Sequence, residues 1–259
     1  MDNAKDAASI SRRRLLQAAA LAVPAVGVMG CTGSHRDAET SQAVRSLNPD
    51  LIETRGGLAA EVPIEALFLT DAERRFLDAA VDRLIPGDEN SPGALLAGVT
   101  TFVDRQLTGP YGQAQTWYMH GPWSKGTKQQ GYQSKLTPAQ MYRAAIHDID
   151  AYCQKKYQKR FDQLPGASQD EVLHGLENGD IDLADAPAKD FFDLLLQNTQ
   201  EGYLADPMYG GNRGFAGWNL IGFPGPRYNY VEEIEQYGKR YTLPTVGLLG
   251  RGDARKRGG

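Results

Sequence analysis

The sequence predicts a mainly α-helical fold, a single compact domain of about five helices with long structured loops. Several windows place apolar residues at helical spacing behind residues that commonly cap helix N-termini. No window shows convincing alternation of apolar and polar residues, which half-buried strands require. We divide the 259 residues into a signal peptide at 1–31, a polar arm at 32–65, the helical domain at 66–242 and a C-terminal tail at 243–259.

The N-terminus carries the features of an export signal. Arg12, Arg13 and Arg14 precede an apolar run over residues 18–29, which is too short for a comfortable membrane span. The pair Arg12 and Arg13, followed closely by leucines, is typical of a twin-arginine signal. A plain secretory signal with a basic start and an uncleaved anchor remain as alternatives. We therefore expect an exported, periplasmic protein.

Cys31 lies at the end of this signal, and its role is open. The three residues before it resemble a lipoprotein cleavage box, so Cys31 is a candidate for lipidation and for attachment to the membrane. The alternative is a cysteine near a conventional cleavage site. From about residue 35 to 61 the chain is polar and without periodicity, which predicts a tether. With Cys153 as the second of only two cysteines, no internal disulfide framework is expected.

The first two helices are expected between residues 70 and 107. Thr70 and Glu73 have the spacing of a capping box, and Pro86 with Gly87 stops the helix that follows. The apolar face of that helix holds Leu77, Ala80, Val81, Leu84 and Ile85. A second helix is expected over residues 94–107, burying Leu95, Val99, Phe102, Val103 and Leu107.

Three further helices and a last short one complete the domain. Thr137, Pro138 and Gln140 predict the start of a helix that runs to about Tyr157 and buries the thiol of Cys153. A short helix is expected from Ser168 to the residues before Gly179, and a longer one opens at Pro187. A final short helix is expected at 228–237.

Two segments combine aromatic residues with helix breakers. The segment 206–226 reads DPMYGGNRGFAGWNLIGFPGP and holds nine glycines and prolines among 21 residues, so no regular helix or strand is expected. Its aromatic content does not suit a solvated linker either. The segment 111–135 is similarly irregular and aromatic. Over residues 111–132 and 203–230 the composition is typical of interface cores, and the alternative is that both segments wrap the chain's own core.

Motifs for catalysis and cofactor binding are missing from the sequence. The glycines at 210–214 lack the Gly-x-Gly-x-x-Gly spacing of dinucleotide folds, and the four histidines lack zinc-site spacing. Two cysteines are too few for an iron–sulfur or haem site. We expect no catalytic residue, bound cofactor or metal in this chain, and the net charge of −4 argues against nucleic acid as a partner.

Residues 201–212, EGYLADPMYGGN, followed by Gly217–Trp218 and by IGFPG at 221–225, resemble the gluconate 2-dehydrogenase subunit 3 family. DRLIPGD at 82–88 supports the resemblance, which covers roughly residues 68–230. It implies the small, or gamma, subunit of a periplasmic FAD-dependent sugar or sugar-acid dehydrogenase. In that family a large subunit of the glucose–methanol–choline type holds the FAD, and a multihaem cytochrome c often passes electrons to the membrane. The small subunit has a chaperone-like role in maturation and export.

The resemblance implies that the aromatic segments dock the partner. The expected contact residues are Tyr209, Asn212, Arg213, Trp218, Phe223, Trp117 and Trp123, with Tyr209, Trp218 and Phe223 as anchors. Two other interpretations stay open. The chain could be a free-standing exported binding or scaffold protein, lipid-anchored if Cys31 is acylated. Alternatively, Asp206 or Arg213 could act on a substrate.

Overall fold

The computed structural model describes residues 68–250, except 90 and 125. All of them belong to one compact unit, residues 57–259. Within the described ranges the chain forms α-helices and no β-strand, so the mainly helical prediction is confirmed. The signal peptide, the polar arm to residue 65, Arg12, Arg13 and Cys31 lie outside these ranges, and their roles stay predictions.

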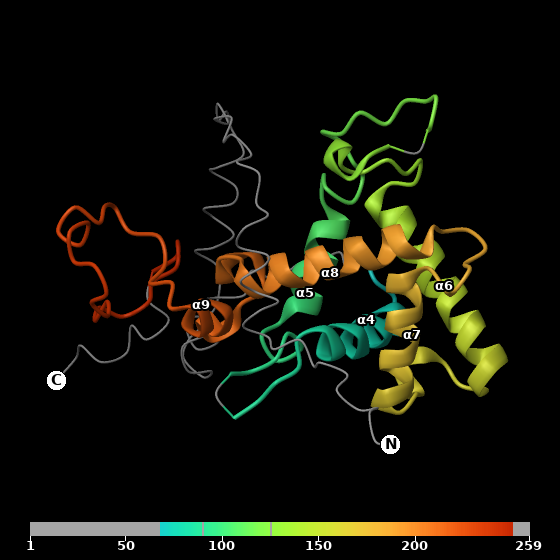
Figure 1. Cartoon of the computed structure of the whole chain (residues 1–259), viewed down its shortest axis with the longest axis horizontal. Helices are drawn as coiled ribbons and strands as arrows, with labels where there is room; N and C mark the ends of the chain where they lie inside the picture. Colours follow the sequence, from blue (N-terminus) through green and yellow to red (C-terminus); the bar gives the residue numbers. More distant parts are fainter. Residues whose placement is uncertain (1–67, 90, 125, 251–259) are drawn as a thin grey trace, which may run out of the picture. The chain divides into compact units, whose positions relative to one another are not determined.

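Helix α8 is the central element of the described fold (Figure 1). It contacts each of the other helices in the described part of the chain. The helices are α4 (Asp71–Leu84), α5 (Val99–Thr108), α6 (Pro138–Tyr157), α7 (Gly166–Asn178), α8 (Ala188–Leu204) and α9 (Ala216–Ile221). Short 3-10 turns are η1 (Lys128–Gln130), η2 (Phe161–Gln163), η3 (Pro207–Tyr209) and η4 (Arg213–Phe215).

Two helix starts follow the capping rules that the sequence shows. The Thr70 hydroxyl accepts from the Glu73 amide at 3.3 Å, and the Glu73 carboxylate accepts from the Thr70 amide at 2.7 Å. The same reciprocal pair joins Thr137 and Gln140 at the start of α6. Each cap satisfies amides that lack partners within the helix, which fixes where α4 and α6 begin.

The expected bounds of three other segments were wrong. Helix α5 begins at Val99 rather than at residue 94, because Gly98 has a left-handed φ of 80° and packs against the Gly210 carbonyl. Leu95, expected to be buried in that helix, is 37% exposed in the preceding turn. Helix α7 begins at Gly166 rather than at the Ser168 cap. Residues 228–237 form turns instead of a helix.

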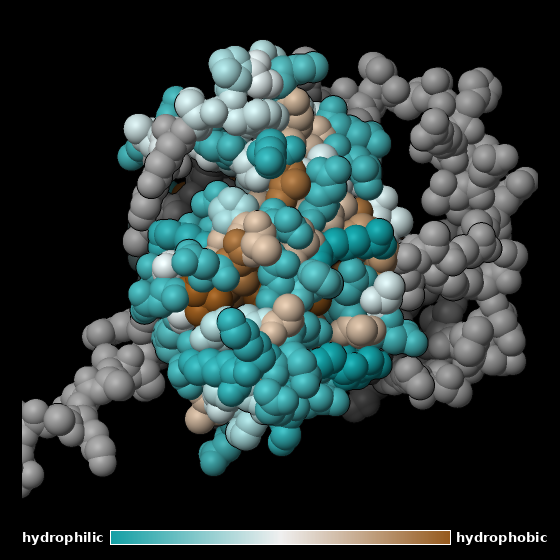
Figure 2. Space-filling model, turned by 90° about the vertical axis from the view of Figure 1, so that its right-hand side faces the viewer, coloured by the Kyte–Doolittle hydropathy of each residue, from teal (hydrophilic) through white to brown (hydrophobic). Residues whose placement is uncertain are grey.

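The core lies between α8 and its neighbours. Phe191 of α8 meets the Tyr142 ring of α6 edge-on at 5.4 Å between centroids. The buried amide of Asn198 links two tyrosine hydroxyls, donating to Tyr142 at 3.1 Å and accepting from Tyr111 at 2.8 Å. By contrast, the face on the side of α6 and α7 is mainly hydrophilic, interrupted by a small apolar patch (Figure 2). None of the described helices is long and apolar enough to cross a membrane.

A buried carboxylate fixes the entry into α4. Asp104 of α5 is fully buried and accepts from the Phe68 and Leu69 amides at 2.9 and 3.0 Å. Its second oxygen pairs with the Arg74 guanidinium. Because a buried charge is costly without partners, these contacts hold the N-terminal end of the described domain against α5.

We expect Asp104→Ala to lower the free energy of unfolding by about 3 kcal/mol, because it leaves two amides and Arg74 without their acceptor. Chemical denaturation of the purified chain measures the change. The control is Asp78→Ala on the half-exposed side of α4, which should stay within about 0.5 kcal/mol of wild type. Equal stability of the two variants would contradict this role of Asp104.

Candidate functional site

The segment 206–226, which we call the glycine-rich loop, caps the C-terminal end of α8. The indole nitrogen of Trp218 donates to the Leu204 carbonyl at 2.6 Å. The Asn212 amide nitrogen donates to the Ala205 carbonyl at 2.8 Å. Because the last carbonyls of a helix have no partner within it, these side chains satisfy groups that would otherwise need water. The loop is therefore an integral part of the end of α8.

Asn212 holds the loop together from inside. Its side chain is completely buried, and its backbone has a left-handed φ of 49°. The side-chain oxygen accepts from the Gly217 amide at 2.8 Å, so both ends of the side-chain amide are engaged. Asparagine tolerates this backbone conformation better than most residues.

Two glycines allow the loop to approach the α8 backbone closely. A Cβ atom added at Gly211 would lie 2.1 Å from the Gly202 carbonyl oxygen, and one at Gly217 would lie 1.9 Å from the Tyr203 carbonyl oxygen. Both distances are far below van der Waals contact, so no side chain fits at either position. These two glycines are therefore required for the packing of the loop against α8. The prediction of no helix in this segment was wrong for residues 216–221, which form the short helix α9.

An aromatic cluster lies on this cap. Trp218 is buried, stacks on Phe215 with centroids 5.5 Å apart, and meets Phe223 edge-on at 5.0 Å. Phe223 keeps 39% of its surface exposed, and Tyr209 on the same loop keeps 46%. The cluster thus has a buried side facing α8 and an exposed aromatic rim.

The charged residues of the loop bind the chain itself. The Arg213 amide donates to the Ala97 carbonyl at 3.0 Å, and its guanidinium donates to the Thr101 hydroxyl at 3.3 Å. The Asp206 carboxylate accepts from the Met208 amide at 3.0 Å and from the Leu248 amide at 2.7 Å. Arg213 and Asp206 therefore connect the loop to α5 and to the C-terminal part of the chain.

The second aromatic segment, 111–135, lies apart from the glycine-rich loop. It is placed over the middle of α8 through the bond from Tyr111 to Asn198, and Figure 1 shows it away from α9. Trp117 is half-buried between the rings of Tyr111 and Tyr132, with centroids at 5.6 and 5.0 Å. Trp123 is exposed. The structure does not bring the two predicted contact segments together.

The predicted contact residues thus divide by exposure. Tyr209, Phe223 and Trp123 are exposed, whereas Arg213 and Trp117 are half-buried. Asn212 and Trp218 are buried in the chain, where they serve the cap of α8. Of the three expected anchors, only Tyr209 and Phe223 offer surface to a partner, and partner contact itself stays a prediction.

Cys153 is a buried thiol, as the helix pattern predicted. Burial, with a smaller effect of the nearby Asp150 carboxylate, raises the pKa of the Cys153 thiol to about 12. The thiol is therefore protonated at neutral pH, and the nucleophilic thiolate form is scarce.

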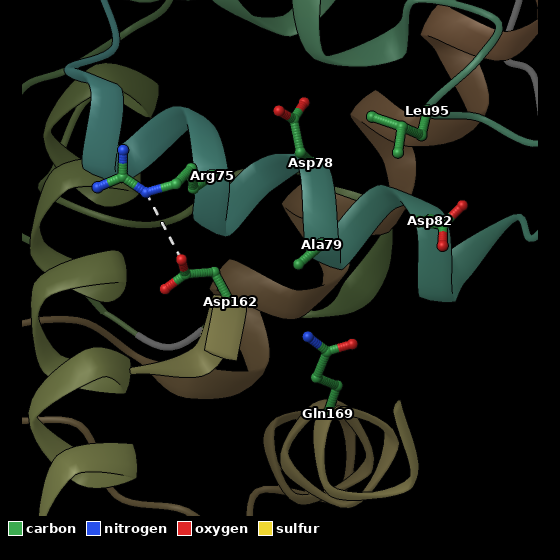
Figure 3. Close-up of a pocket in the computed structure, with 7 residues that line it drawn as sticks. All are labelled: Arg75, Asp78, Ala79, Asp82, Leu95, Asp162 and Gln169. Carbon is green, nitrogen blue, oxygen red and sulfur yellow. Dashed lines mark ion pairs between the residues drawn. The ribbon is translucent and has the colours of Figure 1, made fainter. Parts of the chain in front are cut away.

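A shallow hollow beside α4 carries several charged side chains (Figure 3). Arg75 points toward Asp162 and pairs with it at 3.5 Å, while Asp78 and Asp82 point away from that pair. The described residues contain no group of three or more acidic, histidine or cysteine side chains that could hold a metal. The hollow therefore shows surface ion pairing and no assembled ligand set.

Sequence reasoning missed a third apolar region, which follows α9. Large apolar side chains stay exposed through this part of the chain: Tyr228, Val231, Ile234, Tyr237, Leu243, Leu248 and Leu249. The sequence shows these apolar residues, and their spacing does not form one face of a helix. Residues 228–237 were nevertheless predicted to form a short helix, and residues 243–259 a C-terminal tail. Contiguous exposed apolar surface marks binding sites in soluble proteins.

Comparison with known proteins identifies one family. The sequence model described as gluconate 2-dehydrogenase subunit 3 matches residues 71–225, more than half of the chain. The match begins with α4 and ends within the glycine-rich loop. No curated protein and no solved structure matches the chain.

We expect Gly217→Ala to lower the free energy of unfolding by about 2 kcal/mol or more, because the new methyl group would collide with the Tyr203 carbonyl. The matched control is Gly109→Ala at the end of α5, where the nearest atom to an added Cβ lies at 3.5 Å. Chemical denaturation should separate the two variants. If Gly217→Ala proved as stable as Gly109→Ala, the tight contact between loop and helix would be refuted.

Proposed function

Because the chain belongs to the gluconate 2-dehydrogenase subunit 3 family, we propose that it is the non-catalytic small subunit of a periplasmic, FAD-dependent, gluconate 2-dehydrogenase-like complex. In this proposal the chain binds the flavoprotein large subunit and supports its maturation and its twin-arginine export. The FAD belongs to the large subunit, which is of the glucose–methanol–choline type, and haem c to a multihaem cytochrome subunit. This chain itself binds no cofactor.

One observation carries the proposal for this chain. The glycine-rich loop, on which the family resemblance chiefly rests, directs its polar groups to the chain's own backbone and its aromatic rim outward. Asn212 and Trp218 satisfy carbonyls of α8, and Asp206 binds the Leu248 amide. Tyr209 and Phe223 remain exposed. Such an arrangement suits docking, because aromatic side chains are enriched where interfaces form.

The export part of the proposal explains why a signal suited to folded cargo would stand on a chain for which no cofactor site is expected. A twin-arginine signal suits folded cargo, and in this proposal the large subunit folds and takes up its FAD in the cytoplasm, before export. If the large subunit lacks a signal of its own, it can cross the membrane only while bound to a chain that has one. Arg12 and Arg13 of this chain would supply that signal, and the complex, or an acylated Cys31, would keep the assembly at the membrane.

The alternative is a free-standing exported binding or scaffold protein, lipid-anchored if Cys31 is acylated. The exposed apolar residues after α9 are compatible with that class as well. The two functions differ in one observable, which is whether a flavin-containing dehydrogenase subunit accompanies the chain.

We expect the affinity-tagged full chain, produced in its own host, to co-purify with a yellow, flavin-containing large subunit. Absorption of the bound flavin and oxidation of gluconate with an electron-accepting dye measure the partner. The tagged chain separated from that partner should show neither property. Recovery of the chain without any flavoprotein, from cells that contain the dehydrogenase activity, would favour the scaffold alternative.

We expect replacement of Arg12 and Arg13 by lysine to leave the flavoprotein subunit in the cytoplasm, because the twin-arginine pathway would no longer recognise its carrier. Fractionation followed by dye-linked dehydrogenase assays measures the distribution. Arg14→Lys is the matched control, since it changes a neighbouring arginine outside the pair and should leave export intact. Normal periplasmic activity in the double variant would contradict the carrier role.

A further inference from the structure

Residues 226–245 form a closed loop, here called the C-terminal loop, whose two ends meet beside α9 (Figure 1). The Val246 amide donates to the Pro224 carbonyl at 3.2 Å. Gly225 between them has a left-handed φ of 87°, and a Cβ atom there would lie 1.7 Å from the Val246 carbonyl oxygen. Only glycine allows the two ends to approach this closely.

The base of the C-terminal loop is bonded to the glycine-rich loop. The Leu248 amide donates to the Asp206 carboxylate at 2.7 Å, and the Thr245 hydroxyl donates to the Asn219 side chain at 3.3 Å. The segment that caps α8 therefore also fixes where the C-terminal loop begins and ends. Loops with adjoining ends that pack on their own side chains are frequently functional.

Polar and aromatic contacts join the two sides of the C-terminal loop near its base. The Tyr230 hydroxyl donates to the Gly225 carbonyl at 2.5 Å, and its ring meets Tyr241 with centroids 5.9 Å apart. The Arg227 guanidinium lies over the Tyr241 ring at 5.0 Å and also donates to the Pro244 carbonyl. The side chains of Arg227, Tyr230 and Tyr241 therefore make contacts within the loop itself.

The other large side chains of the C-terminal loop stay in solvent. Tyr228 is fully exposed and Tyr237 is 87% exposed. Between and beyond them are Val231, Ile234 and Leu243, each with more than half of its surface exposed. The loop therefore combines a fixed base with an apolar outer surface, and hydrophobic burial would stabilise any complex that covers that surface.

We propose that the outer surface of the C-terminal loop, centred on Tyr228, Ile234 and Tyr237, is the principal docking element for the flavoprotein subunit. The inference rests on the proposed function and names the surface that performs it. It shifts the main contact from the glycine-rich loop, which is largely engaged with α8, to the segment that this loop anchors.

The available area suits a protein partner. The two tyrosines alone offer on the order of 400 Å² at about 200 Å² per aromatic side chain, which is half of the roughly 800 Å² that each partner buries in a standard interface. The exposed aliphatic residues of the loop, Val231, Ile234 and Leu243, add further apolar area. Because the base is already held by bonded contacts, binding would cost little ordering of the backbone.

The charges disfavour a membrane as the occupant. Three glutamates at positions 232, 233 and 235 surround Ile234, and three basic residues elsewhere in the loop balance them. Anionic lipid attracts clustered lysine and arginine, whereas carboxylates beside the apolar residues would be repelled by it. A protein surface can pair these carboxylates at the rim while the apolar side chains are buried.

The test uses the full chain and the flavoprotein large subunit of the complex, prepared separately and mixed. The variant carries Tyr228→Ser, Ile234→Ser and Tyr237→Ser. The control carries Leu95→Ser and Leu96→Ser, which are exposed and lie outside the C-terminal loop and outside both predicted contact segments. Binding is measured by calorimetry or biolayer interferometry, and the melting temperature of each variant shows that folding is unchanged.

We expect the triple variant to bind at least about 30-fold more weakly than wild type, as removal of an interface hot spot does, while the control binds as wild type. Equal binding by the triple variant overturns the docking role and leaves the proposed function standing.

Failure of the wild-type chain to bind the flavoprotein refutes the proposed function itself. If light scattering shows a wild-type dimer that the triple variant dissociates, the loop belongs to a second copy. If flotation with anionic phospholipid vesicles is lost in the triple variant alone, it belongs to a membrane. Either result overturns the proposal.

Discussion

The structure depends on one close approach, the packing of the glycine-rich loop against the C-terminal end of α8. Helix α8 contacts every other described helix, so its end is a fixed point for the whole core. At that end Gly211 and Gly217 bring the loop within reach of the helix carbonyls, and Asn212 and Trp218 donate to them. A single segment therefore both supplies hydrogen-bond donors to the last carbonyls of α8 and covers the end of that helix with aromatic side chains.

This constraint carries on to the surface where function is proposed. Asp206 begins the glycine-rich loop and also receives the Leu248 amide, so the cap and the base of the C-terminal loop share one carboxylate. A route of direct contacts therefore leads from the core through the cap to exposed tyrosines. In a subunit proposed to bind a flavoprotein, such a route lets a small helical domain present apolar side chains in a defined position without losing them to its own core.

The seven predicted contact residues show how far composition can be taken. Aromatic and arginine residues are enriched both at interface cores and in loops that close a protein's own core, so the sequence could not separate Trp218, which is buried, from Phe223, which is exposed. Their separation depends on which side of the loop faces α8. Tyr228 and Tyr237 were not among the predicted contact residues, because the helix expected over residues 228–237 would have buried one side of that segment.

The sequence by itself determined the features that depend on neighbouring residues and on family resemblance. The starts of α4 and α6 follow from caps within four residues, the stop before Gly87 follows from proline, and the family follows from a specific run around residues 201–212. Only the tertiary structure decided the start of α5, the short helix α9 and the open turns at 228–237. These depend on contacts between residues far apart in the chain, such as Gly98 against Gly210 and Asp206 with Leu248, and no local pattern encodes such distances.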